Sequence, residues 1–194
     1  EVGLGKTMVA RGVIAKTIEH LKGSKARADF VYICSNAAIA HQNVARLNVL
    51  GQKDFSLASR LTLLPLHVKN LAANRINFVS FTPGTAFDLK SQGGWRPERI
   101  LIFRMLQGSG LNSDGLANLL HATARPSGWA NALAKQTEAF DPDIADRYIQ
   151  SLQADEAFFE ALRRLALKFK TYREDVPRQD INERYAVIGD LRQR

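Results

Sequence analysis

The chain has 194 residues, of which 45% are hydrophobic and 24% charged, so it can bury a core and does not belong to the intrinsically disordered class. Its one cysteine, Cys34, excludes a disulfide framework. No apolar run approaches the roughly 20 residues of a membrane span, and no signal peptide opens the chain. The composition therefore predicts a soluble, intracellular (cytoplasmic) protein with no membrane partner.

The net charge of +8 is unevenly distributed along the chain. Residues 1–97 hold 13 Lys and Arg against 5 Asp and Glu, whereas residues 98–194 hold 14 of each kind. All of the excess positive charge thus lies in the first half, which favours a polyanionic partner there, either nucleic acid or phosphates. A generic basic surface explains the charge alone equally well.

The first half alternates between helical and strand patterns. Apolar residues recur at helical spacing from Lys6 to Leu21, and Gly23 follows as a C-cap. Runs of β-branched and aromatic residues favour strands, and Ser35 is placed to cap the helix after the first of them. The expected elements are a helix over 6–21, a strand over 30–34, a helix over 36–47, and strands over 61–64 and 76–81. This order is typical of an α/β fold with a parallel sheet.

From residue 98 onward the pattern becomes helical. Helices are expected over 98–106, 114–124, 158–169 and 184–194, and Asp141-Pro142-Asp143 predicts the start of another. We therefore divide the chain into an α/β part (1–97), an α-helical insertion (98–175) and a final helix (176–194).

The one specific motif stands at the beginning of the chain. Gly3-Leu4-Gly5-Lys6-Thr7 carries the tail of a phosphate-binding loop, G-x-x-x-x-G-K-[ST], directly before the first helical pattern. In such a loop the backbone N–H groups cradle phosphates, the Lys reaches the β/γ-phosphates, and the Thr hydroxyl ligates Mg²⁺. The alternative is a glycine-rich turn that caps an ordinary helix. Because the strand that should precede the loop is absent and residues 184–194 stop within a helical pattern, we expect an internal fragment of a larger protein.

These residues also carry a family resemblance. Glu1–Thr7, E-V-G-L-G-K-T, is similar to motif I of superfamily 2 helicases and especially of Swi/Snf-type translocases. Val31–Asn36, followed by His41-Gln42, resembles motif Ia, and Ser80–Thr85 resembles the Thr-Pro-Gly element of motif Ib. The resemblance covers about residues 1–87 and implies an incomplete RecA-like phosphate-loop domain with a helical insertion.

The resemblance also implies a set of site residues. ATP and Mg²⁺ are the expected cofactors, with Lys6 in the catalytic role and Thr7 as the Mg²⁺ ligand. The expected nucleotide-binding residues are Gly3, Leu4, Gly5, Lys6, Thr7 and Met8. The backbone of DNA or RNA would be contacted by Ser35, Asn36, Thr82, Pro83 and Gly84. Small polar groups at the carboxyl ends of strands suit phosphate oxygens, although an ordinary helix cap and an ordinary turn have the same residues.

Asp155-Glu156-Ala157-Phe158 spells the start of a D-E-A-x box, whose acids would hold Mg²⁺ and orient water. Such a box has to end a buried strand, whereas the residues that follow repeat at helical spacing. We therefore expect Asp155 and Glu156 to lie in the first turn of a helix, where the helix dipole favours acids.

The expected parent is an ATP-dependent helicase or translocase, and the chain is part of its first motor domain. Hydrolysis would need motif II and a second motor domain of the same parent, so the fragment alone is expected to be inactive. Two alternatives remain: a non-motor phosphate-loop NTPase, such as a nucleotide-gated switch or a kinase, and a degenerate structural module.

Overall fold

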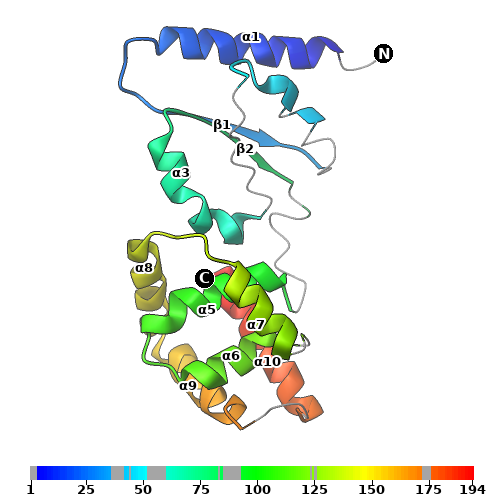
Figure 1. Cartoon of the computed structure of the whole chain (residues 1–194), viewed down its shortest axis with the longest axis vertical. Coiled ribbons are helices and arrows are strands. Elements are labelled where there is room, and N and C mark those ends of the chain that lie inside the picture. The colour runs from blue at the N-terminus through cyan, green and yellow to red at the C-terminus, as the bar shows by residue number, and fades with distance from the viewer. Residues whose placement is uncertain are drawn as a thin grey trace. The chain divides into compact units, whose positions relative to one another are not determined.

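The structure is a computed structural model that describes residues 4–35, 42–43, 45–51, 60–82, 84, 93–122, 124, 126–171 and 176–194. It is a mixed α/β structure, mostly helical, whose chain divides into two compact units, Glu1–Asp88 and Leu89–Arg194 (Figure 1). The described elements of the first unit are α1 (Leu4–His20), β1 (Ala28–Ile33), η1 (Leu61–Leu66), α3 (Val68–Ala73) and β2 (Ile76–Phe81). Those of the second are α5 (Arg96–Met105), η2 (Leu106–Gly108), α6 (Ser113–His121), α7 (Pro126–Lys135), α8 (Pro142–Gln153), α9 (Glu156–Phe169) and α10 (Arg178–Gln193).

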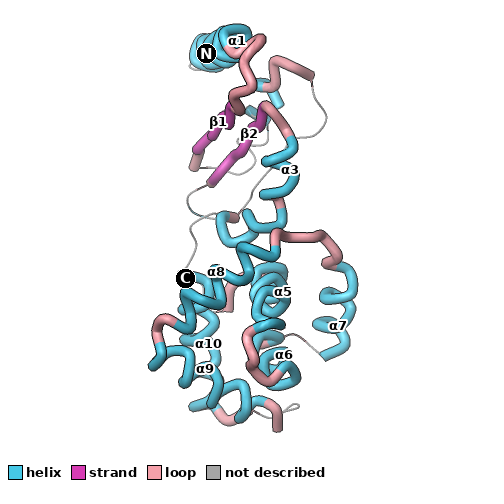
Figure 2. The backbone as a smooth tube through the Cα atoms, turned by 90° about the vertical axis from the view of Figure 1, so that its left-hand side faces the viewer, coloured by secondary structure: helices cyan, strands magenta, loops and turns pink. Residues whose placement is uncertain are grey.

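The first unit is built around a small parallel sheet. β1 and β2 pair in register from Ala28 opposite Ile76 to Ile33 opposite Phe81. Parallel strands need a crossover connection, and the described part of that connection includes η1 and α3. Figures 1 and 2 show the two strands between α1 on one face and α3 on the other. The sequence therefore predicted the α/β class of this unit correctly, together with a parallel sheet.

Side chains alternate between the two faces of the sheet, as the period of two requires. Phe30 of β1 and Phe78 of β2 stack with their ring centroids 5.2 Å apart. Both pack in the cluster that holds the buried Ile14 of α1. Val9 and Val13 belong to the apolar pattern from which this helix was predicted, and they are 68% and 59% exposed. α1 contributes Ala10, Ile14 and Ile18, spaced four residues apart, to this cluster.

One predicted strand is wrong. Residues 61–64 form the beginning of the 3₁₀ helix η1, which contains Pro65 and buries Leu63. A run of four apolar residues does not distinguish a strand from a buried helical turn. In the helix predicted over 36–47, residues 42–43 and 45–47 are helical, whereas 36–41 and 44 lie outside the described residues.

The second unit is a helical bundle with one continuous apolar core. Its fully buried members include Leu119 and Leu120 of α6, Leu162 and Phe169 of α9, and Ile188 of α10. α6 and α9 approach closely because position 115 is a glycine: a side chain there would overlap the carbonyl of Ala166 in α9. The sequence predicted that the helical part begins after Pro97. The helical unit begins earlier in the chain, because Arg99 of α5 donates hydrogen bonds to the carbonyls of Gly93 and Gly94.

Buried arginines donate hydrogen bonds to the backbone carbonyl groups at the C-terminal end of α6. The last carbonyls of an α-helix have no intrahelical partners. At the end of α6, Arg99 Nε donates to the Leu120 carbonyl at 2.8 Å, and Arg184 donates to the carbonyls of Asn118 and Ala122 at 3.1 and 3.0 Å. Burial lowers the pKa of both guanidinium groups. Positive charge at this position is favoured by the helix dipole.

The two ends of the helical unit meet at a buried ion pair. Arg192 in the last turn of α10 places its Nε 3.4 Å from Glu98 Oε2, and both side chains are almost fully shielded from solvent. Glu98 also accepts a hydrogen bond from the backbone N–H of Trp95. Gly94, whose φ is +57°, lies so close to Arg192 that a side chain there would overlap it. The final helix therefore packs onto the first residues of the same unit.

Candidate functional site

The predicted phosphate loop leads directly into α1. The helix begins at Leu4, so Leu4, Gly5 and Lys6 supply backbone N–H groups of its first turn. The N–H groups of a first turn have no carbonyl partners within the helix, and the dipole makes this end attractive to anions. Gly3 and the residues before it lie outside the described residues.

The side chains of the motif differ in exposure. Lys6 and Gly5 are exposed, and Thr7 is half-buried against the helix surface. Met8, predicted among the nucleotide-binding residues, is 65% exposed. A guanidinium or ammonium that reaches a phosphate has to be solvent-accessible before the ligand binds, and Lys6 meets that condition. The donor set at this helix end is thus one ammonium, one hydroxyl and several free N–H groups.

The helix end and the strand ends lie at the same edge of the first unit. α1 runs in the opposite direction to β1 and β2, so its N-terminus is on the side where both strands have their carboxyl ends (Figure 1). Open α/β sheets bind ligands outside the carboxyl ends of their strands. The fold therefore brings Lys6 and Thr7 to the edge of the sheet where both strands have their carboxyl ends.

The predicted backbone-contact residues follow these strands. Ser35 after β1 is exposed, as is Gly84 after β2, whereas Thr82 is only 8% exposed. The strand ends are held together by the N–H of Cys34, which donates to the carbonyl of Phe81 at 3.1 Å. Asn36 and Pro83 lie outside the described residues. Ser35 and Gly84 are thus available to a ligand, and Thr82 contributes its side chain to the packing.

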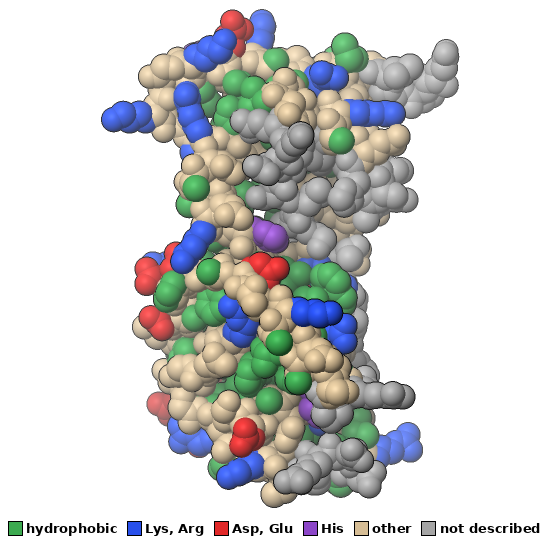
Figure 3. Space-filling view, in the orientation of Figure 1, with side chains coloured by type: hydrophobic (Ala, Val, Ile, Leu, Met, Phe, Trp, Pro, Cys, Tyr) green, Lys and Arg blue, Asp and Glu red, His purple; other side chains and the backbone are tan. Residues whose placement is uncertain are grey.

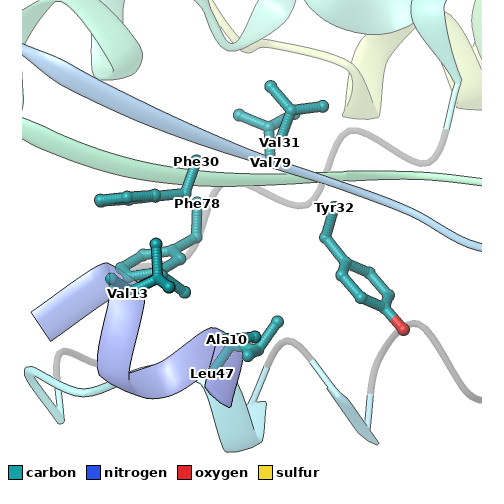
Figure 4. A pocket seen from close by; sticks show the side chains of 9 residues that line it. Ala10, Val13, Phe30, Val31, Tyr32, Leu47, Phe78 and Val79 are labelled. Carbon is teal, nitrogen blue, oxygen red and sulfur yellow. The ribbon is translucent and has the colours of Figure 1, made fainter. Parts of the chain in front are cut away.

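An apolar cavity of about 300 Å³ lies between α1 and the sheet. Figure 4 shows Phe30, Phe78 and Tyr32 from the strands facing Ala10 and Val13 of α1. The Tyr32 hydroxyl accepts a hydrogen bond from the side-chain amide of Asn43 at 2.8 Å. The lining is almost entirely apolar, so this cavity offers no site for phosphate.

The acids of the D-E-A-F stretch lie at the start of a helix, as predicted. Asp155 is the N-cap of α9, its Oδ1 accepts from the N–H of Phe158 at 3.1 Å, and Glu156 lies in the first turn. The second carboxylate oxygen accepts from Arg194 at 2.7 Å. The hydrogen bond from Arg194, followed by that from the Phe158 N–H, lowers the pKa of the Asp155 carboxyl. Among the residues that the structure describes, no three His, Cys, Asp or Glu side chains gather in a way that could hold a metal ion.

The charge distribution is visible on the surface. Figure 3 shows Lys and Arg side chains predominating over the first unit on the face drawn, whereas acidic and basic side chains are interspersed over the helical unit.

Comparison with family models, with curated proteins and with solved structures gives no match. In the described parts of the chain, every helix is too short or too polar to cross a membrane. The first unit is thus a basic α/β module in which α1 begins at the edge where both strands have their carboxyl ends.

Proposed function

We propose that the chain is part of the first motor domain of an ATP-dependent nucleic-acid translocase or helicase, with an incomplete RecA-like fold in its first unit. The observation that carries the proposal is the position of Lys6 and Thr7 in the first turn of α1, at the edge where β1 and β2 end. Motif I chemistry needs this arrangement, because the phosphates bind where free N–H groups and a strand-end crevice coincide.

The residues of the helix end fit ATP and Mg²⁺. The N–H groups of Leu4 to Thr7 would bind phosphate oxygens, and the exposed Lys6 ammonium would neutralise charge on the β- and γ-phosphates. The Thr7 hydroxyl, on a half-buried side chain, is the Mg²⁺ ligand that these residues offer. When bound, Mg²⁺ supplies charge neutralisation at the phosphates.

Binding of nucleic acid is proposed at the same edge of the sheet. Ser35 and the N–H of Gly84 are exposed donors beyond the two strand ends, suited to phosphate oxygens of DNA or RNA. The excess of Lys and Arg in residues 1–97 would attract the polyanion and make its affinity depend on salt. Asn36, Pro83 and the buried Thr82 complete the proposed set.

An NMR titration of the chain tests nucleotide binding even if the affinity is low. We expect MgATP to shift the backbone amide signals of Gly5 to Met8 more than those of any helix in the second unit. Lys6→Ala should abolish the shifts, whereas Lys16→Ala, an exposed lysine of the same helix, should retain them. In the intact parent, Lys6→Ala should abolish ATP hydrolysis that nucleic acid stimulates.

The outcomes separate the candidate functions. Amide shifts scattered over the basic surface, unchanged by Lys6→Ala, contradict the phosphate loop and leave a structural module. MgATP binding at α1 with no response of parent hydrolysis to DNA or RNA indicates a non-motor NTPase.

A further inference from the structure

A second cavity lies wholly within the helical unit. It has a volume of about 370 Å³ and is formed by the end of α5, η2, the loop before α8, and α8 itself. Its floor is apolar, with Met105 and Ala145 buried and Ile149 half-buried. Its mouth opens between exposed residues, among them Gly108 and Ala139. Pockets that hold small ligands range from about 300 to 1,000 Å³, so this cavity suits a ligand no larger than one nucleotide.

One wall of the cavity holds a cation with an unused donor. The guanidinium of Arg104 lies over the ring of Phe140, 5.0 Å from the ring centroid. Its Nη1 is shielded from solvent and has no hydrogen-bond partner. A buried donor without a partner is costly, and guanidinium is the side chain best suited to bind a phosphate or carboxylate. The contact with Phe140 holds the guanidinium plane in place beside the cavity.

The same cavity has one acceptor at its rim. Asp146, in the second turn of α8, lines the cavity and is exposed. Within the described residues, its carboxylate has no hydrogen bond or ion pair. The cavity therefore combines a guanidinium that can bind an anion, a carboxylate that can accept hydrogen bonds, and an apolar floor with an aromatic wall.

We propose that this cavity binds a single unstacked nucleotide. The base would lie in the apolar part against the Arg104–Phe140 stack, its phosphate would bind Arg104, and its edge would donate hydrogen bonds to Asp146. Aromatic rings and guanidinium planes are the usual platforms for unstacked bases. One guanidinium also matches the single negative charge of a phosphodiester. As a nucleic-acid contact the proposal rests on the proposed function, but the cavity can be tested without it.

The acceptor at the rim predicts a base preference. A carboxylate accepts most strongly from an edge with two adjacent donors, which among the bases only guanine provides through N1–H and N2–H₂. Cytosine and adenine offer an exocyclic amine, and uracil offers a single imino N–H. We therefore expect affinity to fall from guanine through cytosine and adenine to uracil.

The test uses the whole chain with Lys6→Ala, so that the proposed phosphate loop does not contribute to binding. GMP, CMP, AMP and UMP are titrated and followed by calorimetry, as are single-stranded tetranucleotides that contain one guanine or none. We expect GMP to bind most tightly. Guanine-containing tetranucleotides that bind at least tenfold more tightly than GMP indicate a strand as the source of the ligand, whereas equal affinities indicate a free nucleotide.

Three variants locate the binding at the cavity. Arg104→Gln should weaken all four mononucleotides at least tenfold. Asp146→Asn should remove the preference for guanine over uracil, and Arg147→Gln, on the exposed side of the same helix, should change neither. Ala139→Phe fills the mouth from an exposed position, so it should block binding even if Arg104→Gln fails to fold.

Two results overturn the proposal. One is the absence of mononucleotide binding to the Lys6→Ala chain, whatever MgATP does to the original protein. The other is a stability coupling between Arg104→Gln and Asp146→Asn without nucleotide binding, which means that these two side chains pair with each other across the mouth.

Discussion

The backbone N–H of Cys34 is hydrogen-bonded to the carbonyl of Phe81 at 3.1 Å, one residue beyond the last paired positions of β1 and β2. This bond fixes the ends of two strands that are 48 residues apart in the chain, as the pairing of Ile33 with Phe81 shows. Ser35 and Thr82 leave the sheet from the same edge as a result. The two loops that the sequence predicted as backbone contacts therefore start side by side.

The exposed hydroxyl of Ser35 is expected to contribute to nucleic-acid binding. Ser35→Ala should weaken binding of two unrelated oligonucleotides by a similar factor of roughly 3–10, because a backbone contact carries no base information. The slope of affinity against salt should stay the same, because no charge is removed. Ser127→Ala, at an exposed position of the helical unit, is the control and should leave affinity unchanged. A loss restricted to one of the two sequences contradicts the assignment.

Gly115 is expected to be irreplaceable in the helical unit. Gly115→Ala places a methyl group against the Ala166 carbonyl, a backbone atom that moves only with α9, so it should destabilise the chain by about 1–3 kcal/mol or more. Gly189→Ala in α10 is the matched control. Nothing lies within 4 Å of its added Cβ, and replacing a helical glycine there should stabilise by up to about 1 kcal/mol. Urea unfolding followed by circular dichroism measures both; equal effects would show that the close approach of α6 and α9 is unimportant.

His121 is expected to make the stability of the chain depend on pH. Burial, together with the nearby charge of Arg184, lowers the pKa of this histidine in the folded state. Its contribution to stability is therefore present above the unfolded pKa of about 6.5 and is lost as the pH falls below it. The midpoint of urea unfolding should drop between pH 7.5 and 5, and His121→Gln should flatten that dependence. His20→Gln, at an exposed position of α1, should leave the pH dependence as it is.

Asp155 is expected to act as a cap and an ion-pair partner, with no part in catalysis. Its folded-state pKa is lowered, chiefly by the hydrogen bond from Arg194, so the stability that it contributes should be lost as the pH falls below about 4. Asp155→Ala removes both interactions and should lower the melting temperature by roughly 2–4 °C, whereas Asp155→Asn keeps the cap and should cost less. In the intact parent, neither variant should change nucleotide hydrolysis. Loss of hydrolysis with unchanged stability would assign Asp155 to the active site after all.

Local signals in the sequence were enough to predict several elements. Residues 76–81 form β2 as predicted, because their aromatic and β-branched run is bounded by turn residues. The Asp141 cap and the acidic first turn of α9 were also predicted correctly, since capping depends only on neighbours in the chain. The helix at Pro126–Lys135 was not predicted. Trp129 in that helix is 5% exposed and packs edge-on against Phe103, a contact that is distant in sequence.

The burial of charged residues could not be predicted from the sequence. Arginine is ordinarily exposed, yet Arg99 and Arg184 are buried, where they donate hydrogen bonds to the carbonyl groups at the end of α6. Arg104 and Asp146 line one cavity only because α5 and α8 pack together. No local pattern contains that information. At the predicted phosphate loop, by contrast, the motif and the start of α1 are neighbours in the chain, so the sequence could place Lys6 and Thr7 in the first turn.

The meeting of Glu98 and Arg192 makes residues near the beginning and the end of the helical unit neighbours in space. A compact unit whose two ends lie close together can be inserted into a surface loop of another protein without stretching either connection. Protein engineers can use this property, and the bundle should keep its fold when residues 93–194 are grafted into such a loop.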